Sequence, residues 1–82
     1  MNYRVIFHAS GSAAIVGLPE AAFIALIEAL ARVGEDPFKN STAGQRDDPD
    51  YREVEFGDLG LAALYVDRPR RTVSVYEVVW AG

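Results

Sequence analysis

The chain has 82 residues, of which 50% are hydrophobic and 24% are charged, and its formal net charge at pH 7 is −4. This length fits one globular domain and excludes a second core, while the composition excludes a disordered chain. The chain has no cysteine, which excludes disulfides and thiolate metal sites, and its acidic balance disfavours binding to nucleic acid.

The N-terminal residues predict a strand and a short helix. Residues 3–8 alternate between two faces, with a Tyr, a Val and a Phe on one of them, which indicates a strand. Residues 10–17 can form one or two helical turns with Ser10 as the N-cap, although Gly11 weakens this helix.

Residues 19–33 predict a long helix, the clearest element of the chain. Pro19 suits the first helical position, and Gly34 can close the C-terminal end. The apolar positions repeat at helical spacing, and we expect all of them to lie in the core, against a sheet and a neighbouring element. These positions are Phe23, Ile24, Leu26, Ile27 and Leu30.

No segment predicts export or insertion into a membrane. The N-terminal residues MNYRVIFHAS have no basic leader and too short an apolar run for a signal peptide. Glu28 and Arg32 interrupt the longest apolar stretch, so it is too short to span a bilayer. We therefore expect a cytoplasmic protein without membrane contacts.

The C-terminal half predicts a loop and three strands within the single domain, which we take as residues 1–82. Residues 37–50 are rich in Pro, Gly, Ser, Asn and Asp, which predicts a long polar loop. A Gly-Asp turn and an Arg-rich turn separate the strands, so we expect an antiparallel meander. The strands are predicted over residues 51–56, 61–66 and 72–80.

The last strand separates into an apolar face and a mixed face. Val73, Val75 and Val79 share one side and are expected to pack under the helix. The opposite side presents Ser74, Tyr76 and Trp80. This assignment assumes a strand without a bulge, because one bulge exchanges the faces. The mixed face either receives a partner strand or helix, or is a half-solvated sheet that covers a small core.

The strand at residues 51–56 divides in the same way. Tyr51, Glu53 and Glu55 would share the exposed face with the mixed side of the last strand. Arg52 would lie on the core side, with its guanidinium group reaching the sheet edge.

Four segments resemble the RelE/ParE superfamily of bacterial toxin–antitoxin toxins, and together they cover nearly the whole chain. The resemblance implies an α+β fold, with a twisted antiparallel sheet that carries helices on one face. The segments are YRVIFHAS at 3–10, LPEAAFIALIEALARVGEDPF at 18–38, YREVEFGD at 51–58 and TVSVYEVVW at 72–80.

The resemblance also implies a set of partners. RelE-like members cleave mRNA in the ribosome, ParE-like members act on DNA gyrase, and most are held inactive by an antitoxin that wraps around them. Such toxins are also known from plasmid stabilisation. The resemblance and the small size favour an antitoxin partner or a homodimer.

The resemblance breaks at the positions where the family carries cations. Arg52 matches an arginine that is common at the start of the second strand, and Gly57 and Asp58 match the following turn. Leu59 and Gly60 stand where an aromatic residue and another arginine are common.

The C-terminal end departs from the family pattern in the same way. Trp80 and Ala81 stand where a His-Arg pair is frequent, and the family's C-terminal tyrosine is missing. The lysines that often lie in the loop or second strand are reduced to Lys39, with Arg46 nearby.

These departures bear on catalysis. Metal-independent RNA cleavage needs cations to stabilise the transition state and usually an acid or base. Glu53 and Glu55 would stand where phosphate must approach. We therefore expect a toxin-fold protein that acts by protein binding, with weak or absent nuclease activity. The alternative is a divergent ribosome-dependent mRNA endoribonuclease.

The candidate site residues follow from this interpretation. If the chain is a nuclease, the catalytic candidates are Arg52, Arg70, Arg71 and Tyr76. The candidates for partner binding are Arg68, Arg70, Arg71, Tyr76 and Trp80.

Two other groups of polar residues contain side chains that occur in catalytic or metal sites. His8 has Ser10 nearby but no obvious acid to orient it, so we expect a surface or capping role. Asp47, Asp48 and Asp50 lack the spacing of a calcium loop, and a solvated turn is expected there. The sequence indicates neither a metal nor a cofactor.

Overall fold

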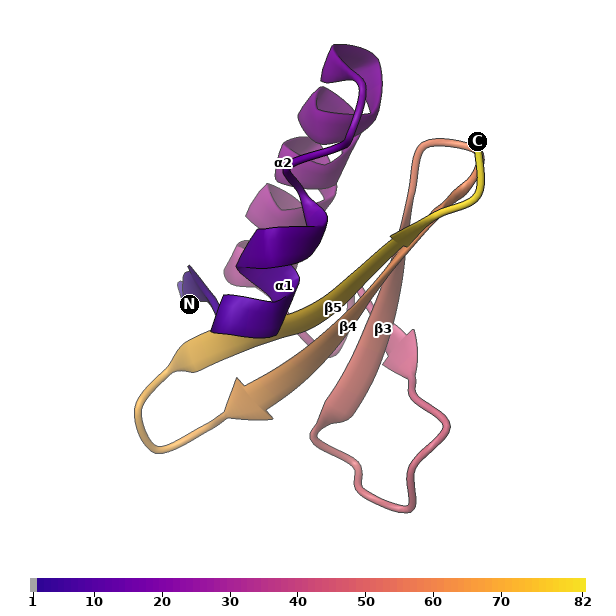
Figure 1. Ribbon diagram of the computed structural model, residues 1–82. Coiled ribbons are helices and arrows are strands. Elements are labelled where there is room, and N and C mark those ends of the chain that lie inside the picture. The colour runs from indigo at the N-terminus through magenta and orange to yellow at the C-terminus, as the bar shows by residue number, and fades with distance from the viewer. Residues whose placement is uncertain (1) are drawn as a thin grey trace.

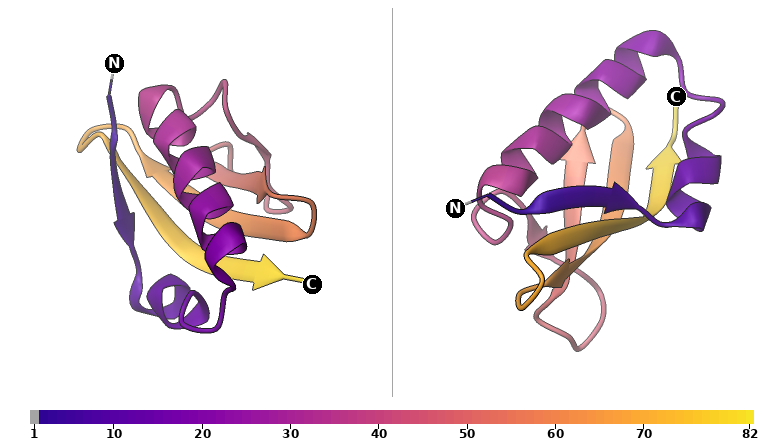
Figure 2. Two further views of the ribbon diagram at one scale, coloured as in Figure 1. Left: turned by 90° about the horizontal axis from the view of Figure 1, so that it is seen from above. Right: turned by 90° about the vertical axis from the view of Figure 1, so that its left-hand side faces the viewer.

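A five-stranded sheet forms the centre of the computed structural model, which describes residues 2–82 (Figure 1). The strands lie in the order β1-β5-β4-β3-β2, and the helix α2 crosses one face of the sheet (Figure 2). No helix of residues 2–82 is long and apolar enough to cross a membrane. The elements are β1 (Arg4–Phe7), α1 (Ala9–Ala14), α2 (Glu20–Glu35), β2 (Thr42–Ala43), β3 (Tyr51–Phe56), β4 (Gly60–Asp67) and β5 (Thr72–Trp80).

The expected antiparallel meander is confirmed, and two further pairings complete the sheet. The strands β3, β4 and β5 pair antiparallel as predicted. β1 joins the other edge of β5 in parallel, from Arg4 opposite Thr72 to Phe7 opposite Val75. The short strand β2, which arises inside the polar loop, pairs antiparallel with β3. The sheet is therefore mixed, and the fold is α+β as the sequence predicts.

The helix α2 begins and ends close to the predicted positions. Pro19 is the N-cap residue, one position before the first helical position that was predicted for it. Gly34 does not close the helix as predicted, because it lies inside the last turn and is buried there. The backbone carbonyl of Gly34 accepts a hydrogen bond from the Tyr3 N–H group at 2.7 Å. A side chain at this position would crowd the backbone just before β1.

The buried stripe of α2 differs from the predicted stripe. Leu26 and Leu30 are buried as expected, but Phe23, Ile24 and Ile27 are 39%, 51% and 42% exposed, so their assignment to the core was wrong. Only one side of the helix faces the sheet, and small residues on that side allow a close approach. The buried residues of α2 are Ala22, Leu26, Ala29, Leu30, Val33 and Gly34.

A β-bulge in β5 exchanges the predicted faces of its C-terminal half. Ala63 of β4 pairs with Glu77 and Leu64 pairs with Val75, so Tyr76 is left as the extra residue. After the bulge Val78 is buried, and Trp80 packs against the core on the side of the helix. The expectation that Trp80 shares an exposed face with Tyr76 was therefore wrong, as was the core position of Val79, which is 49% exposed.

The helix α1 lies beside β5, beyond the end of β1. Ser10 does not cap this helix as predicted, because its hydroxyl donates a hydrogen bond of 2.7 Å to the backbone carbonyl of Tyr76. Gly11 is buried against the backbone of β5, and a Cβ atom placed on it would lie 2.4 Å from the Val75 carbonyl oxygen. The residue that seemed to weaken this helix is what allows it to approach the strand.

We predict that Gly11→Ala lowers the free energy of unfolding by about 1–3 kcal/mol, because α1 must move away from β5 to admit the methyl group. Urea denaturation monitored by circular dichroism measures this change. Gly17→Ala is the matched control, because no atom lies within 4 Å of the added Cβ there. Equal stabilities of the two variants would contradict the close packing of α1.

Candidate functional site

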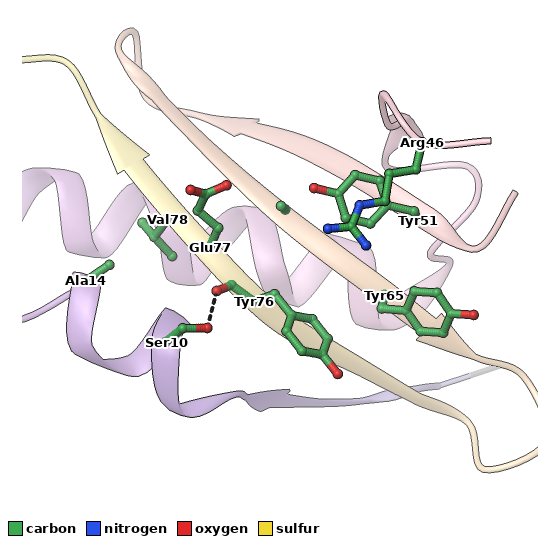
Figure 3. A pocket seen from close by; sticks show the side chains of 9 residues that line it. Ser10, Ala14, Arg46, Tyr51, Tyr65, Tyr76, Glu77 and Val78 are labelled. Atoms are coloured by element: carbon green, nitrogen blue, oxygen red, sulfur yellow. Dashed lines mark hydrogen bonds between the residues drawn. The ribbon is translucent and has the colours of Figure 1, made fainter. Parts of the chain in front are cut away.

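A groove of ≈ 700 Å³ lies on the face of the sheet opposite α2 (Figure 3). Its floor and walls come from three strands, from α1 and from the loop before β3. The side chains that define it are Arg46, Tyr51, Ala63, Tyr65, Tyr76 and Glu77.

The strand register explains why aromatic and acidic side chains meet in this groove. Tyr51 pairs with Tyr65, which places two tyrosines side by side on one face. In the next row of this face Ala63 stands between Glu53 of β3 and Glu77 of β5. The bulge then adds the Tyr76 ring, so that aromatic residues border an acidic row.

The residue Tyr76 is held from two sides, by His8 at the N-cap of α1 and by Ser10 in its first turn. The His8 ring stacks on the Tyr76 ring with 4.4 Å between centroids and 27° between the planes. The His8 Nδ1 atom lies 3.2 Å from the Ser10 hydroxyl, which in turn donates to the Tyr76 carbonyl. His8 is exposed and stands at the N-cap of α1, as expected for a surface or capping residue. Its contact with Tyr76 could not be predicted, because it depends on the bulge.

The far wall of the groove carries a cation on an aromatic ring. The guanidinium carbon of Arg46 lies 4.8 Å from the centroid of the Tyr51 ring (Figure 3). On the neighbouring strand, hydrogen bonding to the Asp48 carboxylate raises the pKa of Tyr65 above its ordinary value of 10.0, and the charges of Asp48, Asp50 and Asp67 act in the same direction. The sequence indicated Arg46 only as a cation near Lys39, and nothing in it predicted the contact between Arg46 and Tyr51.

Arg52 has a structural position outside the groove. Its guanidinium group donates hydrogen bonds to the Ser41 hydroxyl at 2.9 Å, to the Ser41 carbonyl at 2.9 Å and to the Phe38 carbonyl at 3.3 Å. It also lies 5.2 Å from the centroid of the Phe38 ring. The predicted position at the sheet edge is therefore confirmed, and the residue fastens the polar loop to β3.

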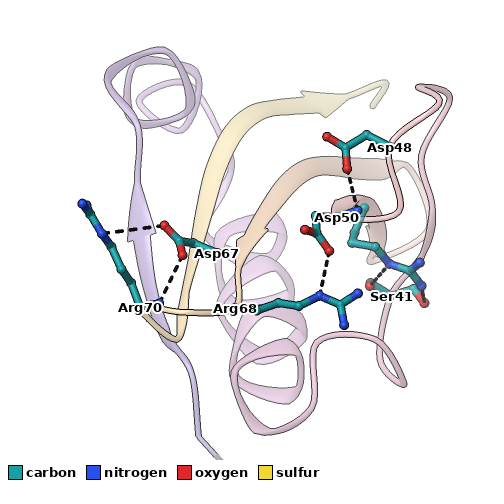
Figure 4. Close-up of polar contacts among 7 residues, drawn as sticks. Ser41, Asp48, Asp50, Asp67, Arg68 and Arg70 are labelled. Carbon is teal, nitrogen blue, oxygen red and sulfur yellow. Dashed lines mark hydrogen bonds and ion pairs between the residues drawn. The ribbon is translucent and has the colours of Figure 1, made fainter.

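The arginines of the β4–β5 turn do not form one cationic surface, because Arg68 and Arg70 each face a carboxylate (Figure 4). Arg68 pairs with Asp50 at 2.9 Å and covers the Phe38 ring at 4.2 Å. Arg70 lies 4.0 Å from Asp67, and Arg71 is exposed with a left-handed φ of 54°. None of these arginines lines the groove, and of the predicted site residues only Tyr76 does so.

The aspartates of the polar loop stabilise a turn. The Asp48 carboxylate accepts a hydrogen bond of 2.9 Å from the Asp50 N–H group, and Asp50 is the partner of Arg68. Within residues 2–82, no three His, Cys, Asp or Glu side chains gather in a way that could hold a metal ion.

Comparison with known proteins identifies the fold. No family model and no curated protein matches the chain. Among solved structures, the toxin–antitoxin complex RelBE2 from Mycobacterium tuberculosis matches with a TM-score of 0.86 and 17% identity, over 99% of this chain and 93% of that one. A mutant of E. coli toxin RelE in the free state matches with a TM-score of 0.84 and 20% identity, over 99% and 85%.

A third structure extends the likeness to archaea. The RelE–RelB complex from Pyrococcus horikoshii OT3 matches with a TM-score of 0.77 and 20% identity, over 100% of this chain and 98% of that one. The chain therefore has a RelE-like fold, in agreement with the resemblance of its sequence segments.

We predict that Arg52→Ala lowers the free energy of unfolding by about 1–3 kcal/mol, because partly buried carbonyl acceptors lose charged donors. Arg70→Ala, at an exposed position of the β4–β5 turn, should change it by less than about 0.5 kcal/mol. Urea denaturation of both variants tests this difference. NMR spectra of the Arg52 variant should leave the amide signals of the groove in place, and their displacement would contradict a purely structural role.

We predict that Tyr65 loses its proton at higher pH than an ordinary tyrosine and that Asp48→Asn lowers this pKa. The raised pKa means that the fold favours the neutral phenol, so its stabilising effect is present below pH 10 and is lost as the pH rises through the folded pKa. NMR titration of the tyrosine rings measures both values. Asp58→Asn serves as a control, and an equal shift in that variant would contradict the assigned cause.

Proposed function

We propose that this chain is the toxin-fold component of a toxin–antitoxin type module and that it acts by binding other proteins, with little or no nuclease activity. The observation that carries the proposal is the exposed apolar stripe of α2, formed by Phe23, Ile24 and Ile27. These three side chains follow one another along one side of a single helix, and contiguous exposed apolar surface of this kind marks interaction sites.

The stripe continues toward the edge of the sheet. A second, smaller groove of ≈ 310 Å³ runs between β1 and α2 and is lined by Tyr3, Val5 and Leu30 among others. Leu30 is also the apolar residue one turn beyond Ile27 on the helix surface. A partner that covers the stripe could therefore extend its contact into this groove. Two of the structural neighbours are complexes of RelE with RelB, which supports an antitoxin-like protein as that partner.

The charges of the groove on the opposite face argue against nuclease activity. Of the side chains that line it, Arg46 is the only cation, and its guanidinium group already makes a cation–π contact with the Tyr51 ring. Glu77 lines the same groove and Glu53 belongs to the same row of the sheet. The loss of one transition-state stabiliser typically lowers a rate by about 10²–10³, and carboxylates here would repel a phosphate as well.

A second candidate function is ribosome-dependent cleavage of mRNA. It is favoured by the tyrosines of the groove, because aromatic rings stack well on nucleic-acid bases. The stacked pair of His8 and Tyr76 could supply an acid and a base beside them. We rank this candidate second, because it requires a phosphate to approach Glu77.

Induced expression of the chain in a bacterium tests the proposal. We expect growth arrest without codon-linked mRNA cleavage. If the product of a short reading frame that adjoins the gene relieves the arrest of the parent chain, we expect it to fail to relieve the arrest caused by Ile27→Glu. A carboxylate forced into an apolar interface should weaken partner binding at least about tenfold. Ala21→Glu is the matched control, because it adds the same charge to the same helix at an exposed position outside the stripe.

The other outcomes of this experiment have defined meanings. Codon-linked cleavage of mRNA would establish the second candidate, and arrest with DNA damage would indicate gyrase as the target. If co-expression of the partner restores growth equally to the parent chain and to Ile27→Glu, the stripe is not the contact surface. If a short reading frame adjoins the gene, its product should restore growth when co-expressed with the parent chain.

A further inference from the structure

We propose that the groove opposite α2 receives an arginine side chain from a basic, extended segment of a protein partner. The guanidinium group would sit on Ala63, beside Glu77 and against the rings of Tyr65 and Tyr76. The inference rests on the proposed function as a protein-binding molecule, and it names the chemistry of the partner at a second surface.

The floor of the groove contains Ala63, with the carboxylate of Glu77 on the neighbouring strand. Glu53, Ala63 and Glu77 face one another across three neighbouring strands, which are spaced about 4.8 Å apart. The methyl group of Ala63 leaves room between the two longer side chains. Neither glutamate forms an ion pair with another residue of the described chain, 2–82. Glu77 therefore offers the groove a carboxylate that has no ion-pair partner within residues 2–82, whereas Glu53 lines a separate hollow together with Lys39.

The walls of the groove suit a planar cation. Tyr65 and Tyr76 expose 38% and 41% of their surface, and each presents a ring beside the row. His8 stacks on Tyr76 and fixes the position of that ring. A guanidinium group gains from both an aromatic face and a carboxylate, and it is more weakly hydrated than an ammonium group. This combination favours arginine over lysine.

The chain already shows how a guanidinium group is held on this wall. Arg46 comes from the polar loop and lies 4.8 Å from the centroid of the Tyr51 ring, at the margin of the same groove (Figure 3). It occupies one tyrosine and leaves the Tyr65, Tyr76 and Glu77 side of the groove open. An incoming arginine would be repelled by Arg46, so this residue should weaken the site.

Electrostatics decides between the classes of ligand. The chain has a formal charge of −4, and the groove is lined by one acidic residue, Glu77, and by one basic residue, Arg46, which already lies on the Tyr51 ring. An anion would therefore meet a repulsive field both at long range and at Glu77. A volume of ≈ 700 Å³ holds several residues of a peptide, which makes an extended segment a better match than a small cation.

The test is an NMR titration of the isotopically labelled 82-residue chain with the tripeptide Gly-Arg-Gly, capped at both ends. We expect a dissociation constant of roughly 1 mM and shifts that centre on the amides of Ala63, Tyr76 and Glu77. The same peptide with citrulline in place of arginine keeps the planar shape but loses the charge, and it should not bind. High salt should weaken the binding, because an exposed ion pair is screened.

Matched variants distinguish binding of the peptide in the groove from a general attraction between the acidic chain and a cation. Glu77→Gln should weaken binding about two- to fivefold, whereas Glu55→Gln removes the same charge outside the groove and should have no effect. Arg46→Gln should strengthen binding by a similar factor. Arg70→Gln, which makes the same change in net charge at the distant β4–β5 turn, should not.

Several results would overturn the inference. They are the absence of binding, equal binding of the citrulline peptide, and equal effects of Glu77→Gln and Glu55→Gln. Shifts of the same amides by a short oligouridine would also overturn it and would favour the nuclease candidate. The titration does not depend on growth arrest or on the stripe of α2. If expression of the chain does not arrest growth but the chain binds the arginine peptide, only the proposed function is refuted. If expression arrests growth but the chain does not bind the peptide, only this inference is refuted.

Discussion

The β-bulge at Tyr76 decides what each face of the sheet presents. Before the bulge, alternate residues of β5 enter the core, and after it the alternation resumes one residue out of step. This shift places Val78 and Trp80 against the core on the side of α2, while Glu77 faces the groove. Because Ser10 donates to the Tyr76 carbonyl, the bulge is tied to α1 and so to the close approach at Gly11. One local irregularity thereby connects the packing of the core with the chemistry of the open face.

The second constraint is geometric. A single helix that packs on a sheet, such as α2, can bury only one of its sides there. The side that packs on the sheet contains small residues such as Ala22 and Ala29, which bring the two layers together. The larger residues Phe23, Ile24 and Ile27 then lie outside this contact. Among residues 2–82 no second layer covers them. An apolar surface that the fold itself does not need for its core is available for a partner.

The sequence was sufficient for features that depend on local chemistry. The three strands of the meander, their turns, the long helix and the position of Arg52 at the sheet edge follow from periodicity and side-chain length, and the structure confirms them. It was not sufficient for features that depend on long-range pairing. The bulge needs β4 as a partner, so Trp80 was placed on the wrong face. The choice between Leu26 and Ile27 as the centre of the buried stripe is a rotation of the helix by about 100°, which helical periodicity alone cannot decide when both flanks are apolar.

The candidate site shows why a shared backbone does not carry a shared chemistry. The pairing of β3 with β4 and of β4 with β5 sets the rows of side chains on the open face. Which charges stand in these rows is a matter of single residues, and here Glu53 and Glu77 occupy the row around Ala63. At the β4–β5 turn Arg68 is paired with Asp50, and Arg70 lies near Asp67, so these cations cannot compensate for the acidic row. The fold fixes where these rows stand, and single residues decide which charges they carry.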